Sequence, residues 1–138
     1  MVVKKTLHSG KVTLALDVKA DSRYRFDRSK IRKGVVELLV SQGVSGRVEL
    51  SLSVVGDRKI RELKKQFLGV DEVTDVLSFP MAEGESIPGE EKMLTLGDVV
   101  VCYPQAKRQA LRRNKLIDDE IEFLVCHGVL HLLGIHHN

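Results

Sequence analysis

The chain has 138 residues, of which 43% are hydrophobic and 30% charged; this suits one hydrophobic core and is too short for two ordinary domains. Residues 1–138 are therefore expected to form a single domain. The N-terminus lacks the apolar stretch of a secretory signal, and no apolar run approaches the roughly 18 residues that span a bilayer. A cytoplasmic protein without membrane contact is expected, and the net charge of +3 is too small to indicate a partner by itself.

Apolar periodicity predicts the elements in chain order. Strands are expected at 12–18, 47–55, 74–79 and 93–102, and helices at 28–41, 57–68, 104–114 and 118–134. The Gly-, Glu- and Pro-rich segment 81–92 is expected to be a mobile loop. The predicted fold class is α+β, with a sheet of about four strands and about four helices, and both mixed and antiparallel strand orders fit.

The core is expected to be built from Val, Leu and Ile, because aromatic residues make up only 4% of the chain. Its largest members are predicted to be Phe26, Phe67, Phe79 and Phe123. The two cysteines are too few for a disulfide framework and are predicted to be small buried residues. A nucleophilic role for Cys126, activated by the following His127, is disfavoured because adjacent helical side chains point about 100° apart.

Three histidines near the C-terminus have the spacing of a metal site. His127 and His131 are four residues apart, so on a helix both imidazoles project from one face. Gly134 can adopt the left-handed conformation that ends a helix, which allows the chain to bring His137 to the same ion. His136 is the alternative third ligand, or a nearby proton carrier.

Three imidazoles leave a fourth metal position for water, as in catalytic zinc sites. Zinc lowers the pKa of such a water to about 7, so that hydroxide forms at neutral pH. One Zn²⁺ per chain is the expected cofactor, although Ni, Cu and Fe also accept imidazole ligands. The expected catalytic group is therefore a water activated by the ion on His127, His131 and His137.

The histidine spacing is also that of the metzincin proteases, in which a glutamate general base follows the first histidine. Gly128 stands at that position here, so peptide hydrolysis is disfavoured. A mid-helix glycine costs roughly 1 kcal/mol relative to alanine, which indicates a packing or functional reason. Gly128 is expected to leave room for substrate or for another backbone segment.

Three blocks of sequence resemble the YbeY family of bacterial endoribonucleases. They are HGVLHLLGIHH at 127–137, TDVLSFP at 74–80 and LGDVVVC at 96–102, in the order found in that family, and the resemblance spans roughly residues 50–138. It implies an α+β fold and a metal-dependent nuclease specific for single-stranded RNA. The implied role is maturation of ribosomal RNA, including the 3′ end of 16S RNA, and ribosome quality control.

The resemblance also implies site residues and partners. It places the metal ligands at His127, His131 and His137, and supporting positions near the cleft at Ser78 and Asp98. The implied partners are ribosomal RNA and ribosomal proteins or the small subunit.

The chain departs from the family pattern at two places. Family members usually carry Tyr-Arg where this chain has Phe67-Leu68, and that arginine suits a phosphate. The family's Tyr-Asp before the third histidine is Ile135-His136 here.

Three functions follow, in order of preference. The first is hydrolysis of RNA phosphodiesters, with Lys64, Lys65, Arg112 or Arg113 guiding the strand. These cations belong to two basic clusters, at 58–65 and 107–115, that are equally compatible with solvated helix faces. The second is a ribosome-associated binding protein that keeps a structural metal and cleaves weakly or not at all, motivated by Leu68. The third, a metalloprotease, is disfavoured by Gly128.

Overall fold

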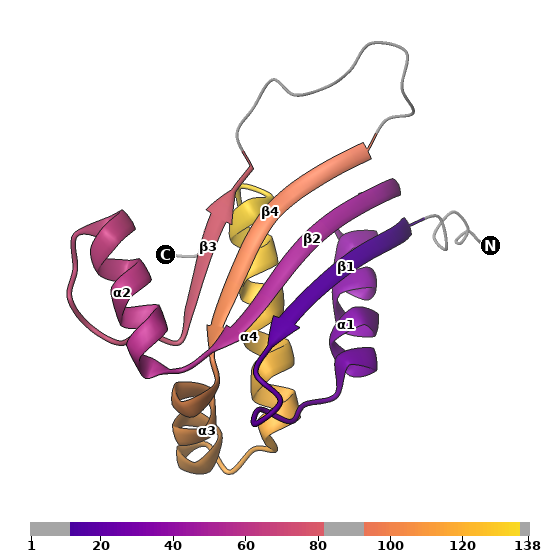
Figure 1. Ribbon diagram of the computed structural model, residues 1–138. Helices are drawn as coiled ribbons and strands as arrows, with labels where there is room; N and C mark the ends of the chain where they lie inside the picture. Colours follow the sequence, from indigo (N-terminus) through magenta and orange to yellow (C-terminus); the bar gives the residue numbers. More distant parts are fainter. Residues whose placement is uncertain (1–11, 82–92, 136–138) are drawn as a thin grey trace.

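The computed structural model describes residues 12–81 and 93–135 of the chain. Figure 1 shows the arrangement of four strands and four helices in this part of the chain. In chain order they are β1 (Val12–Ala20), α1 (Arg28–Ser41), β2 (Gly46–Val55), α2 (Asp57–Leu68), β3 (Val76–Pro80), β4 (Met93–Cys102), α3 (Tyr103–Arg112) and α4 (Ile117–Leu132). The predicted α+β class is confirmed. The predicted loop at 81–92 lies, apart from Met81, outside the described residues.

The sheet is mixed, which is one of the two arrangements compatible with the sequence. Its strand order is β1-β2-β4-β3, with β1, β2 and β4 parallel and β3 antiparallel to β4. The edge position of β3 accommodates Pro80, which has no N–H to donate to a further strand. Opposite Pro80, Gly97 has φ +131°, and a Cβ there would run into the carbonyl oxygen of Phe79. Glycine therefore lets β3 lie close against β4.

Helices α1 and α4 cover one face of the sheet (Figure 1). The core between them consists of buried aliphatic side chains: Val48, Leu50, Leu52, Val99 and Val101 from the sheet, and Ile31, Val35, Leu39, Ile121, Leu124, Val125 and Val129 from the helices. Each such side chain contributes roughly 1.5–3 kcal/mol on burial. Neither α4 nor any other helix in the described ranges is long and apolar enough to cross a membrane.

Helix α2 packs on the opposite face of the sheet. Ile60 forms a second buried cluster with Leu77, Val100 and Cys102. Because side chains alternate along a strand, β4 buries residues against α4 and α2 in turn. The helix ends at Gly69, whose φ of +73° is left-handed. This packing brings the C-terminal end of α2 to the side of β3.

The first turn of α4 is anchored by a buried carboxylate. Glu120 Oε2 accepts hydrogen bonds from Gln109 Nε2 and Arg113 Nη1, both at 2.9 Å, and Lys115 Nζ lies 3.0 Å from Oε1. Burial raises the pKa of this carboxyl, but its contacts with Lys115, Gln109 and Arg113 outweigh that effect and hold the pKa below the usual value. The charge also complements the positive end of the helix dipole. The start of α4 is thereby tied to α3.

Two of the four phenylalanines expected in the core lie at the surface. Phe67 is 57% exposed and Phe123 is 52% exposed, whereas Phe26 and Phe79 are partly buried. The aliphatic clusters fill both faces of the sheet without Phe67 or Phe123. This part of the core prediction is therefore wrong, and both exposed rings border the cleft described next.

Candidate functional site

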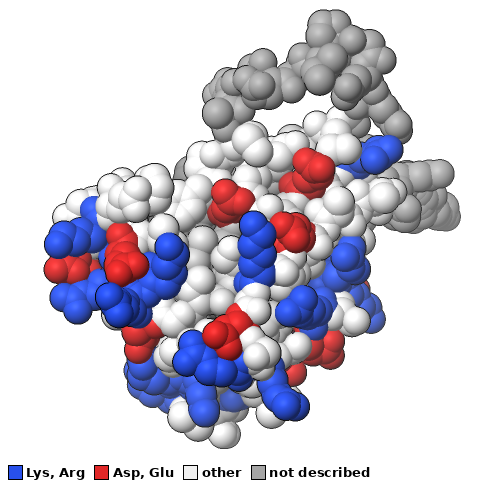
Figure 2. Space-filling model, viewed as in Figure 1, with Lys and Arg blue, Asp and Glu red and all other residues white. Residues whose placement is uncertain are grey.

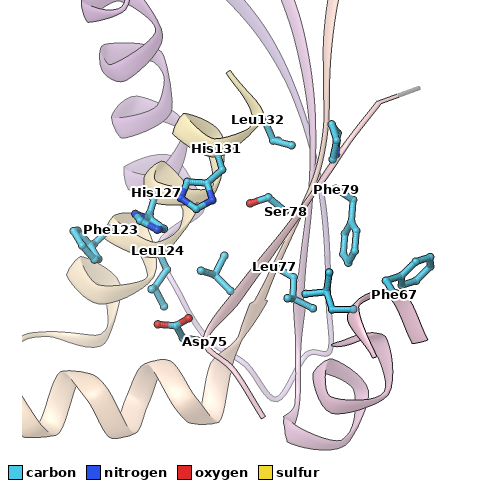
Figure 3. A pocket seen from close by; sticks show the side chains of 13 residues that line it. Phe67, Asp75, Leu77, Ser78, Phe79, Phe123, Leu124, His127, His131 and Leu132 are labelled. Carbon is cyan, nitrogen blue, oxygen red and sulfur yellow. The ribbon is translucent and has the colours of Figure 1, made fainter. Parts of the chain in front are cut away.

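A cleft of about 870 Å³ lies between α4, β3 and the C-terminal end of α2. Figure 3 shows Phe123 on one side of it and Phe67 on the other, with His127, His131 and Ser78 between them. The described lining comprises residues 67–68, residues 75–80, and Phe123, Leu124, His127, His131 and Leu132 of α4. It contains no lysine or arginine. The cleft is thus mostly apolar, with two imidazoles and the carboxylate of Asp75.

The two histidines project from the same face of α4, as their spacing predicts. Their ring centroids are 4.4 Å apart and the ring planes meet at 49°. Since each Zn–N bond measures about 2.0–2.1 Å, two nitrogens that share an ion lie at most about 4.2 Å apart. Ring centroids 4.4 Å apart place the two imidazoles near enough for one nitrogen of each to reach the same ion.

Helix α4 ends at Leu132, two residues before the predicted end, and Gly134 adopts the expected left-handed conformation. Gly134 has φ +84°, and its N–H donates to the carbonyl of His131 at 3.0 Å, while the N–H of Ile135 donates to Leu130 at 2.9 Å. The predicted third ligand, His137, and its alternative, His136, lie outside the described residues. Among residues 12–81 and 93–135, no three metal-binding side chains are grouped for an ion. A three-ligand site on the histidine pair therefore needs a ligand from outside those ranges.

Gly128 allows α4 to approach the sheet beside His127. A Cβ at this position would lie 3.0 Å from both γ-carbons of Val99 and 3.1 Å from Ser78 Oγ. Ser78 Oγ donates a hydrogen bond to the Gly128 carbonyl at 3.2 Å. The space made by the missing side chain is therefore taken by strand side chains, not by substrate or another backbone. Ser78 lines the cleft and helps to hold α4 there.

Replacing Gly128 with alanine is expected to destabilise the fold. Overpacking of this kind costs about 1–3 kcal/mol, and the better helix propensity of alanine returns only about 1 kcal/mol. Urea unfolding of the variant measures the difference. In a Val99→Ala background, which removes both crowded γ-carbons, the same substitution should cost less. Equal costs in the two backgrounds would mean that this contact does not limit how closely α4 packs.

Asp98 lies away from the cleft. It pairs with Phe79 in the β3–β4 register, whereas Ser78 pairs with Val99, which faces α4. Asp98 therefore points to the other face of the sheet, where it borders hollows shared with Ser51. The expectation that Asp98 supports the cleft is corrected by this placement.

The four basic residues predicted to guide RNA do not border the cleft. Lys64 Nζ pairs with Glu72 at 2.7 Å, with only 16% of the lysine side chain exposed. Arg113 contacts the buried carboxylate that anchors α4. Lys65 borders a separate hollow on α2, and Arg112 lies on α3.

Both basic clusters contain ion pairs with neighbouring carboxylates. Figure 2 shows Lys and Arg side chains over α2 and α3, mixed on α2 with acidic ones. Arg61 Nε lies 2.7 Å from Asp71 Oδ1, and this contact lowers the pKa of that carboxyl. Arg58 pairs with Glu62 on the same helix. The α2 cluster is therefore better described as a solvated, ion-paired helix face than as a phosphate-binding surface.

Three cleft features were not singled out from the sequence: Phe67, Phe123 and Asp75. Phe123 precedes His127 by four residues, and its ring stacks near that imidazole with centroids 6.2 Å apart. The spacing of 123, 127 and 131 is the signal that could have assigned Phe123 to the cleft. Asp75 and Phe67 come from other elements, so only the tertiary fold brings them to the histidines.

Neither cysteine is an activated nucleophile. Burial raises the pKa of Cys102 to about 12, and that thiol donates to Asp57 Oδ1 at 3.2 Å. Burial also raises the pKa of Cys126 to about 11. Both remain protonated thiols near neutral pH.

Comparison with known proteins identifies the family. The sequence profile of the family described as Endoribonuclease YbeY matches residues 17–138. The chain belongs to the YbeY endoribonuclease family. This confirms the resemblance of the three sequence blocks. In this YbeY family member, the matched region includes the described cleft and the last three residues, 136–138.

Several relatives share most of the chain. The Endoribonuclease YbeY of Pelotomaculum thermopropionicum is 44% identical over 107 residues, which make up 78% of this chain and 70% of the relative. That of Aquifex aeolicus is 38% identical over 117 residues, or 82% of this chain and 75% of the relative. The solution structure of a Thermotoga maritima protein matches with a TM-score of 0.55 and 28% identity, covering 90% of this chain and 75% of that one.

Proposed function

We propose that this YbeY family member is a metal-dependent hydrolase that cuts phosphodiester bonds within single-stranded RNA. The observation that carries the proposal is the placement of His127 and His131 side by side in a cleft, at 4.4 Å between ring centroids. Relatives that are 44% and 38% identical to it over the matched residues are named as endoribonucleases.

The residues that would hold the ion are His127, His131 and His137. Imidazole nitrogen is a ligand of Zn²⁺, and a one-turn spacing on a helix suits a shared ion, so one Zn²⁺ per chain is the first choice. A divalent ion held there would supply an activated water and neutralise charge on the attacked phosphate.

The rest of the chain positions the two imidazoles. The buried Glu120 fixes the first turn of α4, and the contacts of Gly128 with Val99 and Ser78 fix the helix against the sheet next to His127. A rigid helix keeps two ligands at a constant separation, which a loop does not.

Peptide hydrolysis is disfavoured by the packing of Gly128. The metzincin general base would stand at this position. Gly128 is buried, and even a Cβ would lie 3.0 Å from Val99. A glutamate side chain here would crowd the sheet, and the residue after the first histidine offers no carboxylate to take a proton.

We further propose ribosomal RNA as the substrate, with a role in forming the 3′ end of 16S RNA and in ribosome quality control in the cytoplasm. The small ribosomal subunit or its proteins would be the partners. This part rests on family membership alone.

An RNA-binding protein with a structural metal is the second candidate. The lack of lysine and arginine in the described cleft lining favours it, because such a cleft lacks the cations that stabilise a phosphoryl transition state. In that case RNA would be bound and left intact.

Incubation of purified protein with a single-stranded oligoribonucleotide and with ribosomal RNA tests the proposal. Cleavage is expected with added Zn²⁺ or another divalent transition metal, and it should stop with chelator and return on metal addition. A casein digest under the same conditions should show nothing. Tight RNA binding without cleavage in the presence of any of these metals would favour the second candidate. Casein cleavage that stops with chelator would favour the metalloprotease.

A further inference from the structure

Phe123 presents a half-exposed aromatic ring beside the histidine pair. It is 52% exposed, although the adjacent Leu124 and Val125 are 2% and 0% exposed, and it belongs to neither core cluster. Its ring plane lies 24° from that of His127 (Figure 3). Packing of the core therefore does not account for this aromatic side chain, which forms part of the cleft wall.

The Lys115 ammonium group lies over the Phe123 ring, which leaves the other side of the ring for a base. Lys115 Nζ is 5.0 Å from the ring centroid and 3.0 Å from Glu120 Oε1. The same carboxylate also binds Arg113, so the three side chains together carry a net charge of +1. The end of the cleft at Phe123 thus combines an aromatic surface with a neighbouring cation.

The opposite wall is apolar as well. Phe67 is 57% exposed and Leu68 is 58% exposed, and both border the cleft. Sites that track a nucleic-acid backbone are lined by lysine and arginine, whereas unpaired bases bind by stacking on aromatic side chains. The side chains of these two walls are therefore better suited to binding bases than to binding phosphates.

We propose that this cleft binds RNA chiefly through its bases, with an unpaired base stacked on Phe123 and the phosphate of that nucleotide toward Lys115. Phe67 provides a second stacking surface on the other side of the histidines. The inference rests on the proposed function, because it takes RNA as the substrate of the same site. It also gives a reason for single-strand selection, since a paired base cannot leave its stack to reach the ring without a cost.

The first test is binding without metal. A fluorescein-labelled single-stranded decaribonucleotide is titrated in the presence of chelator, and its anisotropy is followed. Phe123→Leu keeps an apolar side chain but removes the ring, and should raise Kd about tenfold, within the range found for base stacking. Phe123→Tyr should bind like the parent. Leu111→Ala, which trims a residue 75% exposed on α3 and outside the cleft, is the matched surface control and should change nothing.

The second test separates stacking from general surface effects. An oligonucleotide of the same length with abasic positions should bind the parent and Phe123→Leu equally weakly. In metal-loaded cleavage, Phe123→Leu should raise KM and leave kcat unchanged, because stacking binds substrate and transition state alike. Melting temperatures should match, since the ring is outside the core.

The outcomes distinguish this inference from the proposed function. If the parent cleaves RNA but Phe123→Leu binds the intact oligonucleotide as tightly as the parent does, the stacking proposal is wrong and the nuclease proposal stands. A second outcome combines two results: the parent never cleaves RNA, and Phe123→Leu weakens binding of intact RNA but not of abasic RNA. In that case the stacking site stands and the nuclease proposal is wrong. Equal losses on both oligonucleotides would also overturn stacking.

Discussion

Replacing either His127 or His131 with alanine is expected to remove metal binding and, with it, RNA cleavage. Two remaining imidazoles hold a divalent ion poorly. Removing a residue that only hydrogen-bonds to a metal ligand lowers metal affinity roughly 10–100-fold, and removing the ligand itself should lower it more. Metal content after dialysis, measured by mass spectrometry, and cleavage rate are the two readouts. Both histidines are only partly buried, so the metal-free variants should fold like the metal-free parent.

The neighbouring histidines supply the controls for this prediction. His137→Ala should behave like His127→Ala, whereas His136→Ala should keep the metal. If the effects of these two substitutions are exchanged, the third ligand is His136. Stoichiometric metal in a His127→Ala, His131→Ala double variant would exclude a site on α4.

The helices and most strand boundaries could be predicted because they depend on local patterns. Helix α2 runs from Asp57 to Leu68 as predicted, and β4 from Met93 to Cys102. The same holds for the histidine pair, since helical spacing alone places both imidazoles on one face. The strand order could not be predicted, because it depends on contacts between segments far apart in the chain.

The position of Asp98 shows where the strand pattern carries no information. Alternation assigns a strand residue to a face only when one face is polar. The residues after Asp98 are apolar on both faces, because Val99 packs under α4 and Val100 under α2. The sequence therefore does not indicate on which face of the sheet the Asp98 side chain lies. Only the register between β3 and β4, which pairs Asp98 with Phe79, places it.

The exposed phenylalanines were misassigned for a related reason. Phe67 falls on the apolar face of α2 with Ile60 and Leu63, as a core residue would. The last turn of α2 reaches the border of the cleft, where the Phe67 ring packs against that of Phe79 with centroids 5.1 Å apart and stays half exposed. Hydrophobic periodicity marks the face of a helix but not how far its partner surface extends.

Leu68→Arg is expected to increase RNA cleavage about ten- to hundredfold without changing metal content. The family usually has arginine here, and a charge-assisted contact with a phosphate is worth roughly 1.5–3 kcal/mol. Leu68 borders the cleft and is 58% exposed, so it does not pack in the core, and the longer side chain has space. The melting temperature should therefore stay within a few degrees of that of the parent.

Matched variants show whether any gain at position 68 comes from the guanidinium. Leu68→Gln adds polarity without charge and should leave cleavage unchanged, while Leu68→Lys should give a smaller gain than arginine because it lacks the bidentate fork. The slope of log affinity against log salt should steepen by roughly one for Leu68→Arg, as expected for one added phosphate contact. Lys64→Ala and Lys65→Ala should have little effect, since Lys64 is paired with Glu72 and neither lysine borders the cleft. If the lysine variants lose cleavage while Leu68→Arg gains none, the phosphate is held on α2 outside this cleft; if no variant changes the rate, this turn does not contact the scissile strand.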